Sequence, residues 1–124
     1  MKQISTGSPF EAQLGYSRAI VKGGWCFVSG VTGYDYATMA MPESALSQAQ
    51  NCFATIERVL TEAGFTMTDI VRVQYTITDA TLVEQIAPAL AAALGAIRPA
   101  ATMVVAGLIR PEMMVEIEVT AFRG

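Results

Sequence analysis

Two acidic residues that could do acid–base chemistry stand close together near the C-terminal end of the sequence, at Glu116 and Glu118. Alternate residues of an extended strand share one face, so these side chains would lie about 6.5–7 Å apart on the same side. From the residues alone, we interpret the pair as part of a solvated strand face. The other interpretation is a carboxylate that positions or deprotonates a water molecule.

Other polar and aromatic side chains could bind a ligand. Tyr16 and Arg18 stand two positions apart in one predicted strand and should share a face. Arg18 could hold a carboxylate through its planar fork, but we favour a surface or interface ion pair. Tyr34, Asp35 and Tyr36 form an aromatic loop that could line a cleft, although we favour exposed tyrosines that pack against a neighbouring subunit.

The sequence contains no histidine, which excludes Ser-His-Asp hydrolysis, Cys-His proteolysis and histidine-ligated zinc chemistry. It also lacks the G-x-G-x-x-G fingerprint of dinucleotide-binding proteins and the G-x-x-x-x-G-K-[ST] motif of P-loops. Cys26 and Cys52 have no metal-like spacing, and we interpret both as small buried hydrophobic residues. We therefore expect neither a metal nor a cofactor.

Composition predicts a single domain, residues 1–124, because half of this length could not bury a sizeable core. The net charge is -3 and there is no run of Lys or Arg, so we expect no nucleic-acid partner. Hydrophobic residues make up 52% of the chain and charged residues only 15%, which favours an oligomer. No apolar segment approaches the length of a leader core or a membrane span, so we expect a cytoplasmic protein without membrane contact.

Local patterns predict an α+β fold with the element order β-β-α-β-α-β-β. The predicted strands are residues 16–22, 25–29, 70–77, 102–106 and 114–122, and the predicted helices are residues 44–63 and 81–94. Gly64 should end the first helix. Thr81 and Glu84 form a capping-box pattern that should open the second, and Pro88 should kink or restart it.

Motifs along nearly the whole chain share one pattern. They are G-Y-S-R-A-I at 15–20, F-V-S-G at 27–30, Q-A at 48–49, T-E-A-G-F-T-M-T-D-I-V-R-V at 61–73, and R-P-A-A-T at 98–102 followed by a strand, a turn and E-I-E. The pattern resembles the Rid/YjgF family of enamine and imine deaminases, whose corresponding motifs are P-Y-S-Q-A-V, E-A-G-x-x-x-x-D-V-V-K and P-A-R-T or P-A-R-S. One residue departs from the family pattern in a way that affects function. Ala101 stands where the family has an arginine that binds the carboxylate of the substrate.

The resemblance implies the chorismate-mutase-like fold, in which two helices cover one face of a mixed sheet. It also implies a homotrimer whose pockets lie between subunits. The implied reaction is hydrolysis of a small 2-imino or 2-enamino acid to a 2-keto acid and ammonia. The alternative is a trimer that binds or regulates through a small molecule without catalysis. The ribonuclease activity sometimes attributed to the family fits an acidic, histidine-free chain least.

The resemblance also assigns site residues. Glu116 matches the pocket glutamate that would act on water, whereas Glu118 is structural. Tyr16 matches the tyrosine at the pocket mouth, although a half-buried interface tyrosine is the alternative, and Gly30 matches a segment where substrate approaches the main chain, although it could be a plain turn glycine.

Two further site residues come from the P-A-R-T-like motif. Thr102 keeps the hydroxyl group of the motif, but Ala101 has no guanidinium group that could hold a carboxylate. The resemblance therefore predicts weakened activity on 2-aminoacrylate, unless Arg18 replaces the missing group.

Overall fold

The computed structural model describes residues 1–124, which form six strands, three α-helices and one 3-10 turn. The strands are β1 (Lys2–Ile4), β2 (Ala19–Lys22), β3 (Trp25–Thr32), β4 (Ile70–Ile77), β5 (Ala100–Val105) and β6 (Val115–Phe122). The helices are α1 (Pro9–Leu14), α2 (Ala45–Ala63) and α3 (Leu82–Leu94), with the 3-10 turn at Met67–Asp69.

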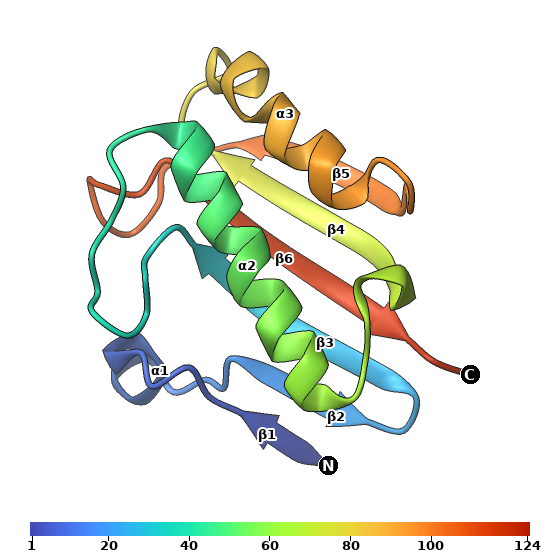
Figure 1. The fold of residues 1–124 in the computed structure, drawn as a ribbon. Coiled ribbons are helices and arrows are strands. Elements are labelled where there is room, and N and C mark those ends of the chain that lie inside the picture. Colours follow the sequence, from blue (N-terminus) through green and yellow to red (C-terminus); the bar gives the residue numbers. More distant parts are fainter.

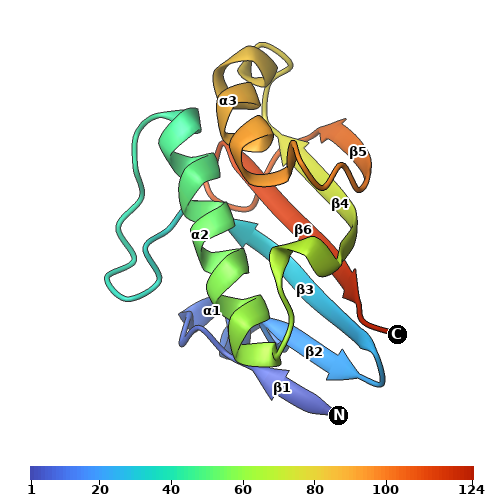
Figure 2. The ribbon, with the colours of Figure 1, turned by 45° about the vertical axis from the view of Figure 1, so that its right-hand side comes forward.

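The six strands form one mixed sheet in the order β1-β2-β3-β6-β4-β5 (Figure 1). All neighbouring strands run antiparallel except β4 and β5, which are parallel and joined through α3. Helices α2 and α3 lie on the same face of the sheet in both views (Figures 1 and 2). The predicted α+β class and the predicted pair of helices on one face are therefore confirmed.

The sequence prediction missed β1 and α1. Strand β1 has only three residues, too few to show a period of two, and its pairing with β2 defines it. Helix α1 does have local signals: Ser8 accepts a hydrogen bond from the Phe10 N–H, Pro9 opens the helix, and Gly15 ends it with a φ of 71°. Strand β2 begins at Ala19 and not at Tyr16, because its pairing with β1 and β3 begins there.

Strand β6 shows why the two faces of the sheet differ. Val115, Ile117 and Val119 are buried under the helices, whereas the alternate residues Glu116 and Glu118 point to the opposite face. No helix covers that opposite face (Figure 2). It carries an exposed aromatic group in which the Trp25 ring lies 4.5 Å from Phe122 and 6.0 Å from Phe27, between ring centroids.

Helix α2 forms as its periodicity predicts, with one buried apolar side facing the sheet. Ser44 caps its start by accepting a hydrogen bond from the Ser47 N–H, and Gly64 ends it with a φ of 85°. Cys52 on this helix and Cys26 on β3 are both free and buried, as predicted. None of the helices combines the length and apolar composition needed to cross a membrane.

The start of α3 differs from the prediction. Thr81 has helical backbone angles and its side chain caps nothing, because its N–H and hydroxyl both donate to the Asp79 carboxylate, at 2.8 and 2.7 Å. Thr66 and Asp69 form a capping box instead, around the 3-10 turn. Helix α3 continues through Pro88, so the predicted restart there is wrong.

Candidate functional site

A pocket of about 250 Å³ lies where the end of α1, strands β3 and β6, and the loop before β6 meet. Its lining residues are Leu14, Tyr16, Ser29, Gly30, Ile109 and Glu116. Three residues that the sequence singled out, Tyr16, Gly30 and Glu116, therefore come together in one cavity. Glu116 is the only charged residue that lines it.

A bulge in β3 shapes the floor of this pocket. The pairing of β3 with β6 shifts register between Val28 and Val31, which leaves one extra residue on β3. Gly30 lies in this stretch, within the strand and not in a turn. A Cβ atom added to Gly30 would lie 2.5 Å from the Glu116 Cδ atom, so only glycine lets the carboxylate lie against the β3 backbone.

Glu116 has the environment of a poised base. It is half-buried, and no protein group donates a hydrogen bond to its carboxylate. Burial raises its pKa above the ordinary value, the nearby Glu118 raises it further, and the positive charge of Arg18 opposes both effects. A carboxylate whose pKa is raised, with unused acceptor sites, can order a water molecule and take its proton.

Arg18 lies beneath the pocket and not on the surface. Its side chain is 1% exposed, and its Nη1 donates to the Gly30 carbonyl at 2.7 Å. Its Nη2 donates to the Tyr16 hydroxyl at 3.4 Å, and its Cζ lies 4.9 Å from the centroid of the Tyr36 ring. The prediction of a surface or interface ion pair is wrong, because the guanidinium is enclosed by aromatic rings and has no carboxylate within 4 Å.

The Tyr16 hydroxyl accepts its hydrogen bond from Arg18, so its own hydrogen remains available to a ligand in the pocket. Burial raises the pKa of this phenol, and the positive charge of Arg18 partly offsets that effect. Tyr16 therefore stays protonated at neutral pH and can act as a hydrogen-bond donor.

The aromatic loop after β3 is part of the protein core. Tyr34 and Tyr36 are only 4% and 8% exposed, so the prediction of exposed tyrosines that pack against a neighbour is wrong. The Tyr36 hydroxyl lies 3.2 Å from both the N–H and the hydroxyl of Thr32. Tyr34 does not line the Glu116 pocket but lines a second cavity beside α1.

Ala101 and Thr102 do not join this pocket within one chain. Both lie on the edge strand β5, and β4 separates that strand from β6. The Thr102 hydroxyl accepts a hydrogen bond of 3.0 Å from the Arg72 guanidinium. Both residues are exposed, so they are free to meet another molecule.

The sequence prediction missed the residues that hold the pocket walls. Leu14 and Ile109 form an apolar rim and are 60% and 66% exposed. Gln48, 1% exposed on α2, donates to the Pro42 and Glu112 carbonyls and accepts from the Met114 N–H. These three hydrogen bonds of the Gln48 side chain fix the loop that leads into β6 and thus the position of Glu116. The chain brings together no group of three or more acidic or thiol side chains that could hold a metal ion.

Comparison with known proteins assigns the fold and the family together. A model of the endoribonuclease L-PSP family matches residues 6–123. The crystal structure of Rv2704 from Mycobacterium tuberculosis, described as a member of the YjgF/YER057c/UK114 family, is 35% identical, covers 98% of each chain and superposes with a TM-score of 0.90. The chain belongs to the Rid/YjgF family. RidA from a Psychrobacter species is 26% identical over 99% of each chain, with a TM-score of 0.88, and protein SCO2049 of Streptomyces coelicolor is 26% identical over 100% of this chain and 93% of its own length.

Membership of the Rid/YjgF family supports a role in binding or deaminating small molecules. It also shows that the sequence resemblance was correct for the fold, including the six-stranded mixed sheet. The sequence resemblance predicts departures from the family motifs at Ala101 and at Arg18, and the structure shows Arg18 to be buried.

Two glycines, Gly30 in β3 and Gly33 just after it, should respond differently to alanine. A Cβ atom on Gly33 would lie 2.6 Å from the Cα atom of Gln48, so the end of β3 would have to move away from α2. Gly33→Ala should therefore destabilise the protein by about 1–3 kcal/mol, the usual cost of overpacking. Gly30→Ala meets only the flexible end of Glu116 and should cost less, while displacing the carboxylate. Urea unfolding of both variants tests this contrast, and equal losses would contradict it.

Proposed function

We propose that the chain forms a homotrimer that hydrolyses a small imine or enamine at a pocket completed between subunits. The observation that carries this proposal is the Glu116 carboxylate, which lies in a pocket, is half-buried and has no protein donor. A structural glutamate buried to this degree would normally be hydrogen-bonded or paired with a cation. Unused acceptor sites facing a cavity are instead what a water-activating base requires.

The proposed reaction uses the residues of the pocket directly. Glu116 takes a proton from water as the oxygen attacks the carbon of the protonated C=N group. The proton held by Glu116 moves to the nitrogen of the resulting amino alcohol. The C–N bond then breaks and ammonia leaves, while the Glu116 carboxylate takes the hydroxyl proton as the carbonyl forms and passes it to the released ammonia, which departs as ammonium. Tyr16 supplies a hydrogen-bond donor at the pocket mouth. No metal, cofactor or nucleic acid enters this scheme, and the partners are the substrate and other copies of the chain in the cytoplasm.

The trimer is supported by apolar surface that one chain leaves uncovered. All six residues of the edge strand β5 are exposed, including the apolar Met103, Val104 and Val105. A flat, apolar edge of this kind associates readily with another chain. A second copy that covers it would also supply Ala101 and Thr102 to a neighbouring site, as the family resemblance implies.

We expect light scattering to give the mass of a trimer at micromolar concentration. The exposed aromatic group of Trp25, Phe27 and Phe122 and the apolar β5 edge would then be covered in the assembled protein. Tryptophan fluorescence provides a second readout, because Trp25 is the only tryptophan of the chain. A stable monomer with a solvent-exposed tryptophan would contradict both the trimer and the intersubunit pocket.

The alternative function, a trimer that binds a small molecule without catalysis, is supported by the charge of the pocket. Its lining contains no cationic side chain, and Ala101 cannot hold a substrate carboxylate. Ammonia release from a panel of cyclic and acyclic imines and enamines, measured against the uncatalysed rate, separates the two functions. Acceleration of at least one substrate supports the enzyme, whereas tight binding without acceleration supports the binder.

A further inference from the structure

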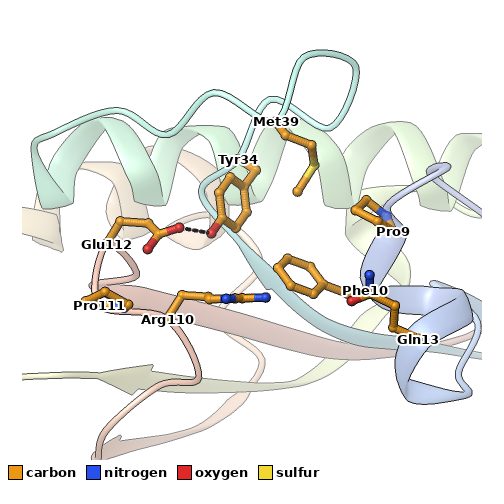
Figure 3. A pocket seen from close by; sticks show the side chains of 8 residues that line it. All are labelled: Pro9, Phe10, Gln13, Tyr34, Met39, Arg110, Pro111 and Glu112. Carbon is orange, nitrogen blue, oxygen red and sulfur yellow. Dashed lines mark hydrogen bonds between the residues drawn. The ribbon is translucent and has the colours of Figure 1, made fainter.

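A second cavity, of about 450 Å³, lies beside α1 (Figure 3) and shares no lining residue with the Glu116 pocket. Its volume falls within the range of pockets that hold small molecules, roughly 300–1,000 Å³. Phe10, Tyr34 and Met39 form apolar walls, and the Phe10 and Tyr34 rings lie 6.0 Å apart at 45°. We propose that this cavity binds a small carboxylate with a flat, apolar body, held by Arg110.

Arg110 has the geometry of an unfilled anion site. Its Cζ lies 5.5 Å from the centroid of the Phe10 ring, and Figure 3 shows its side chain extended along the cavity toward that ring. Its guanidinium forms no hydrogen bond and no ion pair, since the only ion pair of the chain joins Arg123 to Asp69. A guanidinium that lies over an aromatic face keeps the N–H groups in its own plane free to bind a planar anion.

The one acidic residue of the cavity is already engaged. Figure 3 shows the Glu112 carboxylate turned toward Tyr34, whose hydroxyl donates to it at 2.5 Å. Burial, together with this bond, raises the pKa of Tyr34 to about 12, so the phenol keeps its proton at neutral pH. Glu112 therefore keeps its negative charge and has a hydrogen-bond donor of its own, and Arg110 remains the cationic group that would meet a ligand.

The apolar walls define the rest of the ligand. A carboxylate on Arg110 would place its attached group between the Phe10 ring and the Tyr34 ring, where a flat body makes more contact than a branched one. Gln13 lies at the α1 side of the cavity and offers a further amide for a polar substituent. The ligand class is therefore an aryl or aryl-acetic monocarboxylate, and none of this depends on the reaction proposed at Glu116.

Calorimetric titration with phenylacetate, and with its uncharged counterpart phenylacetamide, tests the proposal on the full chain. We expect phenylacetate to bind at least about tenfold more tightly than the amide, because only its carboxylate can form a pair of charge-assisted hydrogen bonds with Arg110. Arg110→Gln should remove that difference, and Arg110→Lys should restore only part of it. Lys22→Gln removes an equal charge from the exposed end of β2 and should leave the affinity unchanged.

The Glu116→Gln variant assigns the binding to the correct cavity, because it should leave phenylacetate affinity unchanged if the ligand occupies the Arg110 site. Four results would overturn the proposal. They are equal affinity for the acid and the amide, no effect of Arg110→Gln, a gain or loss of phenylacetate affinity in Glu116→Gln, and no heat of binding at millimolar phenylacetate.

Discussion

Glu116→Gln is expected to lower turnover by roughly 10²–10⁴, the range that removal of a general base usually gives, on any imine the parent protein hydrolyses. Glutamine keeps the size of the side chain and its place against Gly30, but it cannot accept a proton from water. Binding of the substrate should change by only a few fold. Steady-state rates of ammonia release from the parent and the variant measure the effect.

Glu118→Gln is the matched control. Glu118 lies two residues further along β6 on the same face, but it is exposed and does not line the pocket. Its substitution should leave turnover nearly unchanged. Unchanged turnover in Glu116→Gln would remove Glu116 from the mechanism, and equal losses in both variants would point to a general electrostatic effect of the strand.

Thermal melting of the Glu116→Gln variant distinguishes a catalytic role of Glu116 from a structural one. Burial and Glu118 raise the folded-state pKa of Glu116 above its ordinary value of 4.5, so the folded protein holds this proton more tightly than the unfolded chain does. The resulting stabilisation is complete below that ordinary value and is lost as the pH rises through the raised pKa. Glu116→Gln should therefore melt at or above the parent's temperature at neutral pH, and this advantage should shrink in acid. A lower melting temperature at neutral pH would indicate a structural role.

Local periodicity predicted the parts of the fold in which one face is buried. The alternation in β6 placed Glu116 and Glu118 on one face, and the spacing of apolar residues in α2 placed its buried side correctly. These patterns work because burial against a single layer forces a period of two in a strand and of 3.6 in a helix. The motif that extends to Glu116 added what periodicity cannot give, namely that one of the two carboxylates faces a pocket.

The environments of Arg18 and Tyr34 could not be predicted in this way, because distant segments create them. Arg18 is buried because the β3 bulge brings the Gly30 carbonyl to its guanidinium and Tyr36 covers it. The Tyr34 ring packs against Phe10 and Tyr36, and its hydroxyl meets Glu112, 78 residues further along the chain. A charged residue and an aromatic loop normally indicate a surface, and only the tertiary contacts reverse that expectation.

Hydrolysis of freshly generated 2-aminoacrylate is expected to be at least ten- to a hundredfold slower than in relatives that have the family arginine. Loss of a charge-assisted hydrogen bond to a carboxylate costs about 1.5–3 kcal/mol, which corresponds to that range of rates. The structure offers no replacement in the pocket: Arg18 is buried, and two of its nitrogen atoms already donate to Gly30 and Tyr16. The one charge that lines the pocket, on Glu116, would repel the carboxylate of the substrate.

Ala101→Arg should then increase ammonia release from 2-aminoacrylate, with Ala100→Arg as the matched control. Both positions are exposed on β5 within one chain, but adjacent strand residues point to opposite faces. Only the arginine at 101 occupies the position of the family motif, and only it should improve the rate. A parent rate equal to that of arginine-bearing relatives would show that the carboxylate is held by another group. An equal gain from both substitutions would show instead that added positive charge on β5 attracts the 2-aminoacrylate anion without binding its carboxylate directly.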